Sequence, residues 1–432
     1  MWYGISLCGK NPFCYITSDF LRSSRGQPAK HNYPPRQKNS VILGDPLMKK
    51  SLLALVALGA FAGAAHAQSS VTLYGIIDEG FIFNNNAKGQ HLYGLSSGVM
   101  QGSRFGLRGT EDLGGGLKAI FTLENGFDVN SGRLGQGGLM FGRQAYVGLS
   151  SQYGTVTLGR QYDSVVDFVG PLEAGDQWGG YIAAHPGDLD NFNNAYRVNN
   201  AVKYTSPTYG GFSFGGLYSF GGQAGQFSKN QVWSLGAGYN NGPLVLGVGY
   251  LNARTPANFG GMFNNGSTAA TTAVSSPVYG AYANTANTYQ VIGAGGAYTF
   301  GAATIGATYS NTKFKGFSVG PFVNQTATFN NGEINFKYQL TPALILGAAY
   351  DYTQGSKING SSAAKYHQGS LGVDYFLSKR TDVYVIGVYQ HASGNTLDAN
   401  GNVVQAHASI NGLDPSATSN QVAARVGIRH KF

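Results

Sequence analysis

From residue 71 onward, hydrophobic and polar side chains alternate in one segment after another. In the first segment, 71–78, Val71, Leu73 and Ile77 share one face, while Asp78 lies on the other. A period of two residues places successive side chains on opposite faces of a β-strand, so each such segment is predicted to be a strand between two different environments. Further segments of this kind include 118–124, 244–250 and 382–389.

The connections between these strands alternate in length. Seven short turns rich in Gly, Pro, Asn and Ser fall at 111–116, 150–154, 206–211, 240–243, 300–302, 340–342 and 378–380. Eight longer polar loops are predicted at 84–100, 128–139, 162–196, 221–228, 254–286, 315–325, 354–364 and 393–418. Together they connect about sixteen strands, and an even number is typical of bacterial single-chain barrels. The predicted fold is therefore all-β, a transmembrane antiparallel β-barrel, with a soluble β-sandwich or propeller as the alternative.

The composition favours the membrane barrel. Gly accounts for 65 of the 432 residues, aromatic residues for 13% and charged residues for 11%, whereas a soluble globular protein has roughly 25% charged residues. An α-helical membrane protein is excluded, because the mean hydropathy is −0.13 and one long apolar run, near the N-terminus, is present.

That apolar run belongs to a predicted secretory signal peptide, residues 48–67. Lys49 and Lys50 form its positive region, and the small residues of Ala65-His66-Ala67 form its cleavage site. The mature protein is therefore predicted to begin at Gln68 and to consist of a barrel domain, 68–432. A membrane anchor is the alternative, but the apolar stretch is short for a span.

Residues 1–47 precede the signal peptide and contain both cysteines of the chain. We interpret them as an upstream extension, with Met48 as the true start. Without residues 1–67, 21 of the 29 basic and 18 of the 20 acidic residues remain, so the net charge is +3 rather than +9. This small charge gives no support for a nucleic-acid partner. The barrel domain also has no cysteine, which excludes a disulfide scaffold.

The C-terminal segment alternates up to its last residue. Val426, Ile428 and the terminal Phe432 fall on one side, and Arg425 and Arg429 fall on the other, together with Lys431. In a barrel the first side would contact lipid and the second would point into a water-filled lumen. Phe432 is predicted to lie in the aromatic girdle and to serve as a signal for the barrel-assembly machinery.

Four stretches carry a resemblance to a known family: Gln68–Asp78, Ser103–Ala119, Leu158–Gln161 and Val426–Phe432. They resemble the trimeric general porins of β-proteobacterial outer membranes, and the likeness runs through the whole barrel domain. The resemblance implies a sixteen-stranded homotrimer surrounded by outer-membrane lipid and lipopolysaccharide. It also implies that the third outer loop folds inward and narrows the pore. Residues 1–47 have no counterpart in that family.

The third loop, 162–196, has features of its own that fit such a role. It is long for a loop, and long loops in compact domains are usually functional. It is also acidic, with Glu173 and Asp176 among its carboxylates, and Trp178 is predicted to act as an aromatic plug beside two glycines. A solvated surface loop is the alternative.

The resemblance further implies an arginine cluster on the wall opposite this loop. The matching positions are Arg104, Arg143 and Arg197. Strand parity points Arg104 and Arg197 into the lumen, whereas Arg143 is in phase with lipid-facing residues and would need a bulge or a place at a strand end. Glu124 also faces the lumen and could hold an arginine in place.

Motifs for other chemistry are weak. Gly-x-Ser-x-Gly occurs at 94–98, 211–215 and 316–320, but no position offers the strand–turn–helix that a nucleophile elbow requires. The histidines show no ligand spacing, so no catalytic residue, cofactor or metal centre is predicted. A surface calcium near Asp398 or Asp188 is left open.

These observations predict a general diffusion porin in the outer membrane, not an enzyme. It would pass ions and small hydrophilic solutes, with a weak preference for anions. The alternatives are a substrate-specific outer-membrane channel and an outer-membrane barrel enzyme such as a lipase.

Overall fold

The structure is a computed structural model that describes residues 69–265 and 275–432. The predicted extension, 1–47, and the predicted signal peptide, 48–67, lie outside the described residues. Within the described ranges, no helix is long and apolar enough to cross a membrane.

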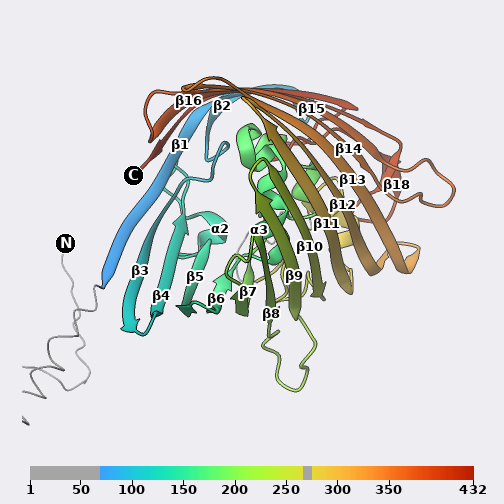
Figure 1. Ribbon diagram of the computed structural model, residues 1–432. Coiled ribbons are helices and arrows are strands. Elements are labelled where there is room, and N and C mark those ends of the chain that lie inside the picture. Colours follow the sequence, from blue (N-terminus) through green and yellow to red (C-terminus); the bar gives the residue numbers. More distant parts are fainter. Residues whose placement is uncertain (1–68, 266–274) are drawn as a thin grey trace, which may run out of the picture. The chain divides into compact units, whose positions relative to one another are not determined.

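The described chain forms one antiparallel sheet that closes on itself (Figure 1). β3 pairs with residues 70–76 of β1, and β2 pairs with residues 79–87 along the same edge, so the two strands share one position in the wall. The seventeen strands therefore occupy sixteen positions, as predicted. The strands are β1 (Ser70–Ala87), β2 (Gln90–Ser97), β3 (Arg104–Gly114), β4 (Leu117–Gly126), β5 (Gln144–Ser151), β6 (Gly154–Gln161), β7 (Val198–Thr205), β8 (Phe212–Ser219), β9 (Val232–Asn241), β10 (Leu244–Arg254), β11 (Thr288–Phe300), β12 (Ala303–Val319), β13 (Phe322–Thr341), β14 (Leu344–Gln354), β15 (Lys365–Phe376), β16 (Thr381–Ser393) and β19 (Asn420–Lys431).

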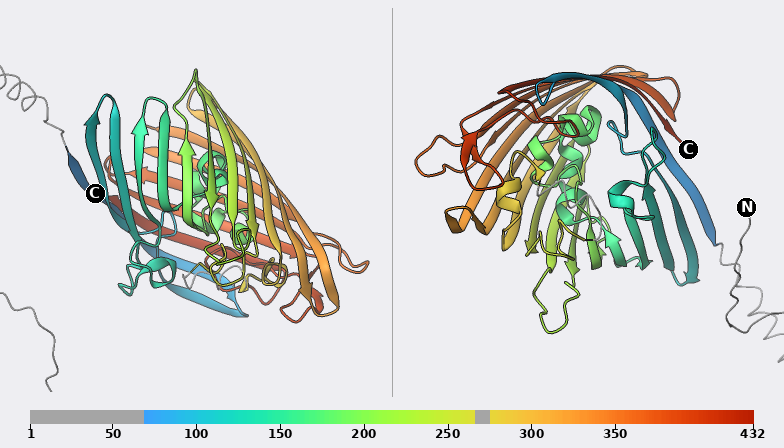
Figure 2. Two further views of the ribbon diagram at one scale, coloured as in Figure 1. Left: turned by 90° about the horizontal axis from the view of Figure 1, so that it is seen from below. Right: turned by 180° about the vertical axis from the view of Figure 1, so that it is seen from behind.

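The helices are all short and belong to the connections. Most of them lie in the third outer loop, which Figure 2 shows inside the barrel wall. The helical segments are α2 (Gly135–Gly138), α3 (Ser164–Phe168), η1 (Gly170–Leu172), η2 (Gly175–Gly179), η3 (Tyr181–Ala183), η4 (Pro186–Asp188) and α5 (Gly280–Ala283), and a two-stranded hairpin of β17 (Asn395–Leu397) and β18 (Val403–Gln405) lies in the last loop.

The seven short turns lie where the sequence predicts them, but two predicted loops are mostly strand. Residues 84–100 contain the end of β1 and all of β2, and residues 315–325 contain the ends of β12 and β13. The backbone ladder continues there because neighbouring strands supply partners, and backbone pairing does not need a continuous pattern of apolar side chains. These prolonged strands explain why β13 reaches 20 residues.

The first and last strands close the barrel. β1 pairs with β19 from Ile76–Lys431 to Asn84–Ala423, and the backbone of Phe432 exchanges two hydrogen bonds with Gly75, both 3.0 Å long. The alternation of β19 is confirmed, since Val422, Val426 and Ile428 are exposed on the outside while Arg425 and Arg429 are buried.

The inward cations of β19 require one correction. Arg425 and Arg429 do point inward, but they are buried in ion pairs instead of lying in open water. Arg425 Nη2 lies 3.2 Å from Asp78 Oδ1, and Arg429 Nε lies 3.0 Å from Asp382 Oδ2. These pairs join the closing strand to its neighbours on both sides.

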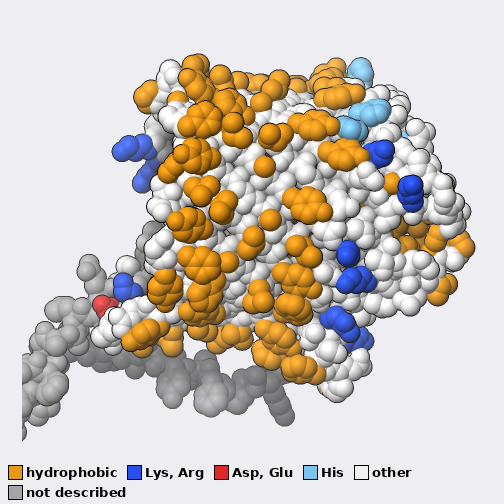
Figure 3. Space-filling view, turned by 45° about the vertical axis from the view of Figure 1, so that its right-hand side comes forward, with side chains coloured by type: hydrophobic (Ala, Val, Ile, Leu, Met, Phe, Trp, Pro, Cys, Tyr) orange, Lys and Arg blue, Asp and Glu red, His pale blue; other side chains and the backbone are white. Residues whose placement is uncertain are grey.

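The outer wall is hydrophobic. Figure 3 shows one face covered with hydrophobic and uncharged side chains, with Lys and Arg toward its margins. Exposed side chains such as Leu73 of β1, Leu158 of β6 and Val248 of β10 come from strands all round the ring. Such a surface fits a hydrocarbon environment and not water.

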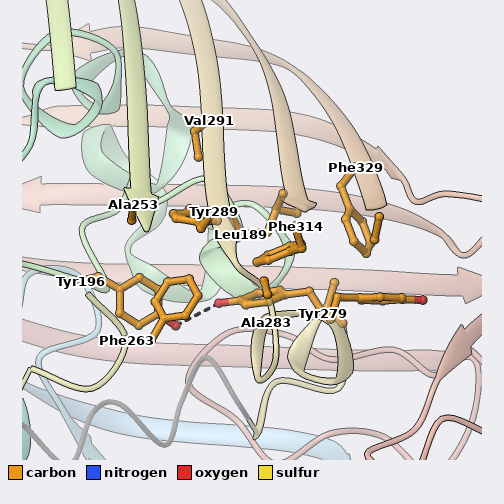
Figure 4. Packing of buried hydrophobic residues seen from close by; sticks show 14 of the residues in the cluster. Leu189, Tyr196, Ala253, Phe263, Tyr279, Ala283, Tyr289, Val291, Phe314 and Phe329 are labelled. Atoms are coloured by element: carbon orange, nitrogen blue, oxygen red, sulfur yellow. Dashed lines mark hydrogen bonds between the residues drawn. The ribbon is translucent and has the colours of Figure 1, made fainter. Parts of the chain in front are cut away.

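A cluster of aromatic side chains fills one side of the interior near the outer rim (Figure 4). Tyr279 of the fifth outer loop stacks on Phe314 of β12, with ring centroids 5.3 Å apart. Tyr279 also lies within 2.9 Å, oxygen to oxygen, of Tyr196 at the end of the third loop. The fifth loop therefore packs the third loop against the wall.

Deleting Phe432 should impair barrel closure. The deletion removes both hydrogen bonds to Gly75 and the ring that covers it, since a Cβ at Gly75 would lie 2.3 Å from Phe432 Cζ. We expect unassembled chain to accumulate and the heat-modifiable oligomer to decrease on gels. Phe432→Tyr, which keeps the ring and backbone, is the control. An undiminished oligomer from the deletion would contradict this role.

Candidate pore constriction

The third outer loop folds into the barrel as a compact unit. Asp163 caps its first helix, α3, by accepting hydrogen bonds from the amides of Val165 (2.8 Å) and Val166 (3.3 Å). Its other carboxylate oxygen accepts a hydrogen bond of 2.7 Å from Asn191, near the end of the loop. One buried carboxylate therefore holds both ends of the loop together, and its burial raises its pKa to about 6.

Glycines on the inner wall provide the surface on which this loop packs. Seven of them would place an added Cβ within 3.0 Å of a side-chain or backbone atom of the loop, so the loop approaches the wall closely at these positions. They are Gly236, Gly247, Gly249, Gly293, Gly295, Gly347 and Gly372.

Trp178 occupies the most tightly fitted part of this surface. Gly347 and Gly372 are paired across β14 and β15, and the indole of Trp178 lies against both. Its side chain is 2% exposed. The predicted aromatic plug is therefore wrong: Trp178 anchors the loop to the wall because two adjacent glycines leave room for the indole.

A cavity of about 450 Å³ lies between the loop and the opposite wall. Arg104, Arg143 and Arg197 all line it, and among the described residues Asp176 is its one carboxylate. Part of its wall is the break between β2 and β3, residues 98–102. The structure thus brings together four of the six residues predicted at the constriction.

Arg143 is fixed by a buried ion pair. It directly precedes β5, so a place at the strand end turns its side chain inward. Arg143 Nε donates to Glu124 Oε1 at 2.7 Å, and Arg143 Nη2 donates to the Tyr162 hydroxyl at 3.1 Å. Tyr74 donates to the second oxygen of Glu124 at 2.9 Å. Glu124 therefore holds an arginine in place, as its strand parity suggested.

Arg104 and Arg197 are held by backbone oxygens instead. Arg104 Nε donates to Gly102 O at 2.8 Å, and Arg197 Nη1 donates to Ala195 O at 3.1 Å. Neither forms an ion pair with a carboxylate among the described residues.

The positive charges of the cluster repel one another. Burial and the charge of Arg143, with smaller contributions from Arg160 and Arg104, lower the pKa of Arg197 to about 9, although Tyr162 opposes the shift. Arg197 therefore remains protonated at neutral pH. Its Nε has no hydrogen-bond partner among the described residues.

Arg160 is a member of the cluster that strand parity misses. It shares the phase of Leu158, which is exposed on the outer wall. A register shift between Gly159 and Gln161, with Gly159 at φ 137°, interrupts the alternation. Arg160 Nε can therefore donate to Gly142 O at 2.8 Å. Gly159 is the feature of the sequence that could have indicated this break in the alternation.

Glu173 requires a correction, because it does not line the cavity. Its side chain is fully buried behind the loop, where Glu173 Oε1 accepts a 2.6 Å hydrogen bond from the His185 amide. Burial raises its pKa well above the usual value, although His185 opposes the shift. Because the loop is irregular, its side chains do not alternate between two faces, so the direction of the Glu173 side chain could not be predicted from the sequence.

Asp176, by contrast, is exposed to the cavity and accepts a hydrogen bond of 2.7 Å from Asn193. Desolvation of the carboxylate by the surrounding protein and the negative charge of Asp188 raise the pKa of Asp176, although the positive charges of Arg104 and Arg143 oppose the shift. It is the loop carboxylate that faces the arginines.

Further cavities lie on either side of the arginine-lined one. A cavity of about 870 Å³ toward the outer loops shares Tyr181 with it, and one of about 440 Å³ toward the short turns shares Pro171. The three cavities thus follow one another past the third loop.

The motifs for other chemistry lie in a hairpin turn and along strands. Asp398 accepts hydrogen bonds from the amides of Asn400 and Asn402 at 2.9 and 2.8 Å, which closes the turn of the β17–β18 hairpin. The three Gly-x-Ser-x-Gly matches lie on or beside strands.

A closed barrel with a hydrophobic outer wall and a loop folded into its lumen defines an outer-membrane channel protein. The family of Gram-negative porins matches residues 54–395, and the chain belongs to this family. It is therefore an outer-membrane porin, a channel and not an enzyme.

Several relatives cover most of the chain. An outer membrane porin protein of Bordetella pertussis and outer membrane porin protein 32 of Delftia acidovorans are each 33% identical, over 89% of this chain and 100% of the relative. The solved anion-selective porin from Comamonas acidovorans aligns with a TM-score of 0.66 and 27% identity, over 84% of this chain and 100% of its own. OmpT of Vibrio cholerae, solved in a trimer form, shares the fold at 18% identity and a TM-score of 0.56.

Gly347→Ala should displace Trp178 and loosen the loop. The new Cβ would lie 2.1 Å from the indole Cδ2, which a rigid ring cannot avoid without moving. We expect a loss of about 1–3 kcal/mol in stability, typical of overpacking, and noisier single-channel current. Gly369→Ala on β15 is the matched control, because its Cβ meets nothing within 4 Å. Equal behaviour of the two variants would contradict the proposed anchor.

Proposed function

We propose that this porin is a general diffusion channel for ions and small hydrophilic solutes, with a preference for anions. Solutes pass through the arginine-lined cavity between the third loop and the wall. The observation that carries the proposal is the imbalance of charge in this cavity. Three arginines line it against one carboxylate, and Glu124 neutralises one of the three.

The loop contributes less negative charge than its sequence suggests. Asp163 and Glu173 are buried within its packing, and Asp167 forms an ion pair with Lys203. A passing anion therefore meets the free guanidinium edges of Arg104 and Arg197 with Asp176 as the opposing charge. Neither arginine forms a salt bridge with a loop carboxylate among the described residues, which argues against a role limited to locking the loop by salt bridges.

The expected preference is moderate. One unit charge acting on another at 4 Å is worth about 1 kcal/mol in bulk water and several times more where protein excludes water. Such energies bias ion permeation several-fold without making the pore exclusive. The Comamonas porin, similar over its whole length, is anion-selective, which supports the same sign here.

We further propose that the protein assembles as a homotrimer among outer-membrane lipid and lipopolysaccharide. Membership of the Gram-negative porin family supports the assembly, since OmpT of Vibrio cholerae, which shares the fold, is solved in a trimer form, and the hydrophobic outer wall fits the lipid.

Replacing Arg104 and Arg197 together by Ser tests the pore assignment. Because two positive charges leave the cavity, the reversal potential in a KCl gradient should shift toward cation preference, several-fold in permeability ratio. The shift should shrink at about 1 M salt, where the screening length is about 3 Å. At that salt, conductance should rise because shorter side chains widen the cavity.

Arg380→Ser is the control, since it removes a cation from an exposed short turn. It should leave selectivity almost unchanged. Unaltered conductance and selectivity in the double variant, together with lower thermal stability, would overturn the assignment and make the two arginines structural.

A further inference from the structure

Behind the third loop lies a buried group of side chains that the pore does not use. Glu173 and His185 come from the loop, and Glu333 comes from β13 of the wall. All three are buried, with Glu333 4% exposed and the others fully enclosed. One ligand atom from each lies within 4.8 Å of the others.

The distances describe a small cage around the His185 ring nitrogen. His185 Nε2 lies 3.8 Å from Glu173 Oε1 and 3.8 Å from Glu333 Oε2. Asp351 Oδ2 of β14 lies 3.7 Å from the same nitrogen. Tetrahedral zinc with bonds of about 2.0–2.2 Å holds its ligand atoms roughly 3.3–3.5 Å apart. The three distances from His185 Nε2 exceed this separation by a few tenths of an ångström, and the ligand atoms of Glu173 and Glu333 lie within 4.8 Å of each other.

The second ring nitrogen of His185 is already engaged. His185 Nδ1 lies 2.7 Å from Asp190 Oδ2, and Asp190 also accepts a hydrogen bond from Ser310. A carboxylate on Nδ1 orients the imidazole and turns Nε2 toward the cage. This arrangement is the usual support of a histidine that binds a metal.

Two carboxylate oxygens in the cage have no partner among the described residues. They are Glu173 Oε2 and Glu333 Oε2. A protonated His185 is the alternative occupant, but its single charge faces four carboxyl groups, Asp190 and Asp351 among them, and the two oxygens still have no hydrogen-bond partner among the described residues. Leaving a buried charged group unsatisfied is costly. A divalent cation would neutralise both glutamates.

We propose that Glu173, His185 and Glu333 bind a divalent transition-metal ion of the zinc class, with Asp351 as a fourth ligand or a nearby acceptor. An imidazole with carboxylates favours zinc over calcium, which takes oxygen ligands. The ion fastens the third loop to the wall through β13. Because the site is enclosed, the ion enters while the loop docks during folding.

The test uses the complete barrel, refolded from denaturant either with ZnCl₂ or with a chelator and then dialysed. Elemental analysis should find about one zinc per protomer after refolding with ZnCl₂. The chelator-refolded protein should melt at a lower temperature, and adding ZnCl₂ during a second refolding should restore it. Protein refolded with Co²⁺ should show the visible absorption of a tetrahedral site.

A second possible zinc position must be removed from the measurement. His367 and His391 lie on the outside of the wall, with ring centroids 6.4 Å apart. All proteins therefore carry His367→Gln, and the comparison is between this parent and the same parent with Glu333→Gln or His185→Gln. The parent should keep its zinc, and both added substitutions should abolish binding.

Asp398→Asn, in an outer hairpin turn, is the matched carboxylate control and should keep the metal. A folded parent that holds no zinc after refolding with ZnCl₂ would overturn the proposal, as would zinc retained by folded Glu333→Gln and His185→Gln variants. If one variant fails to fold, the zinc content of the parent and of the other variant still tests the proposal. The result is independent of the pore's selectivity, which depends on Arg104 and Arg197.

Discussion

The hydrocarbon core of a membrane offers no hydrogen-bond partner to a peptide group, so a sheet that crosses it can have no open edge. In this porin the requirement is met where β1 pairs with β19 and Phe432 pairs with Gly75. Closure also divides every strand into a lipid-facing and an inward side. The buried pair of Arg425 and Asp78 joins the strands at this seam, so charge inside the barrel supports its closure.

Closure creates an interior that the third loop divides. Glycines on β9 to β15 let the loop pack against one side, with Trp178 seated between Gly347 and Gly372. The arginine-lined cavity lies on the opposite side, where Arg104, Arg143 and Arg197 converge. The site is therefore a consequence of packing: the side on which the loop is anchored determines which wall residues line the passage.

The sequence predicts the features that depend on regular strands, namely their number and the direction of their side chains. Alternation and turn residues indicated the sixteen positions, and parity placed Arg104, Arg197 and Glu124 on the inner side. Prediction failed where the backbone departs from regularity. Gly159 breaks the alternation and redirects Arg160, and the irregular third loop turns Glu173 away from the pore. Residues 84–100 form strands where a loop is predicted, because the pairing of backbone groups does not require regular alternation of the side chains.

We propose that one face of the third loop lines the passage while the other is packed on the wall. Thiol labelling tests it directly, since both cysteines of the chain precede the barrel. Asp176→Cys places a thiol on the cavity, and Ala183→Cys places one in the packed face, where Ala183 is 1% exposed. A bulky methanethiosulfonate reagent should strongly reduce current through Asp176→Cys channels and leave Ala183→Cys channels unchanged. Block of Ala183→Cys channels with no effect on Asp176→Cys would contradict this account.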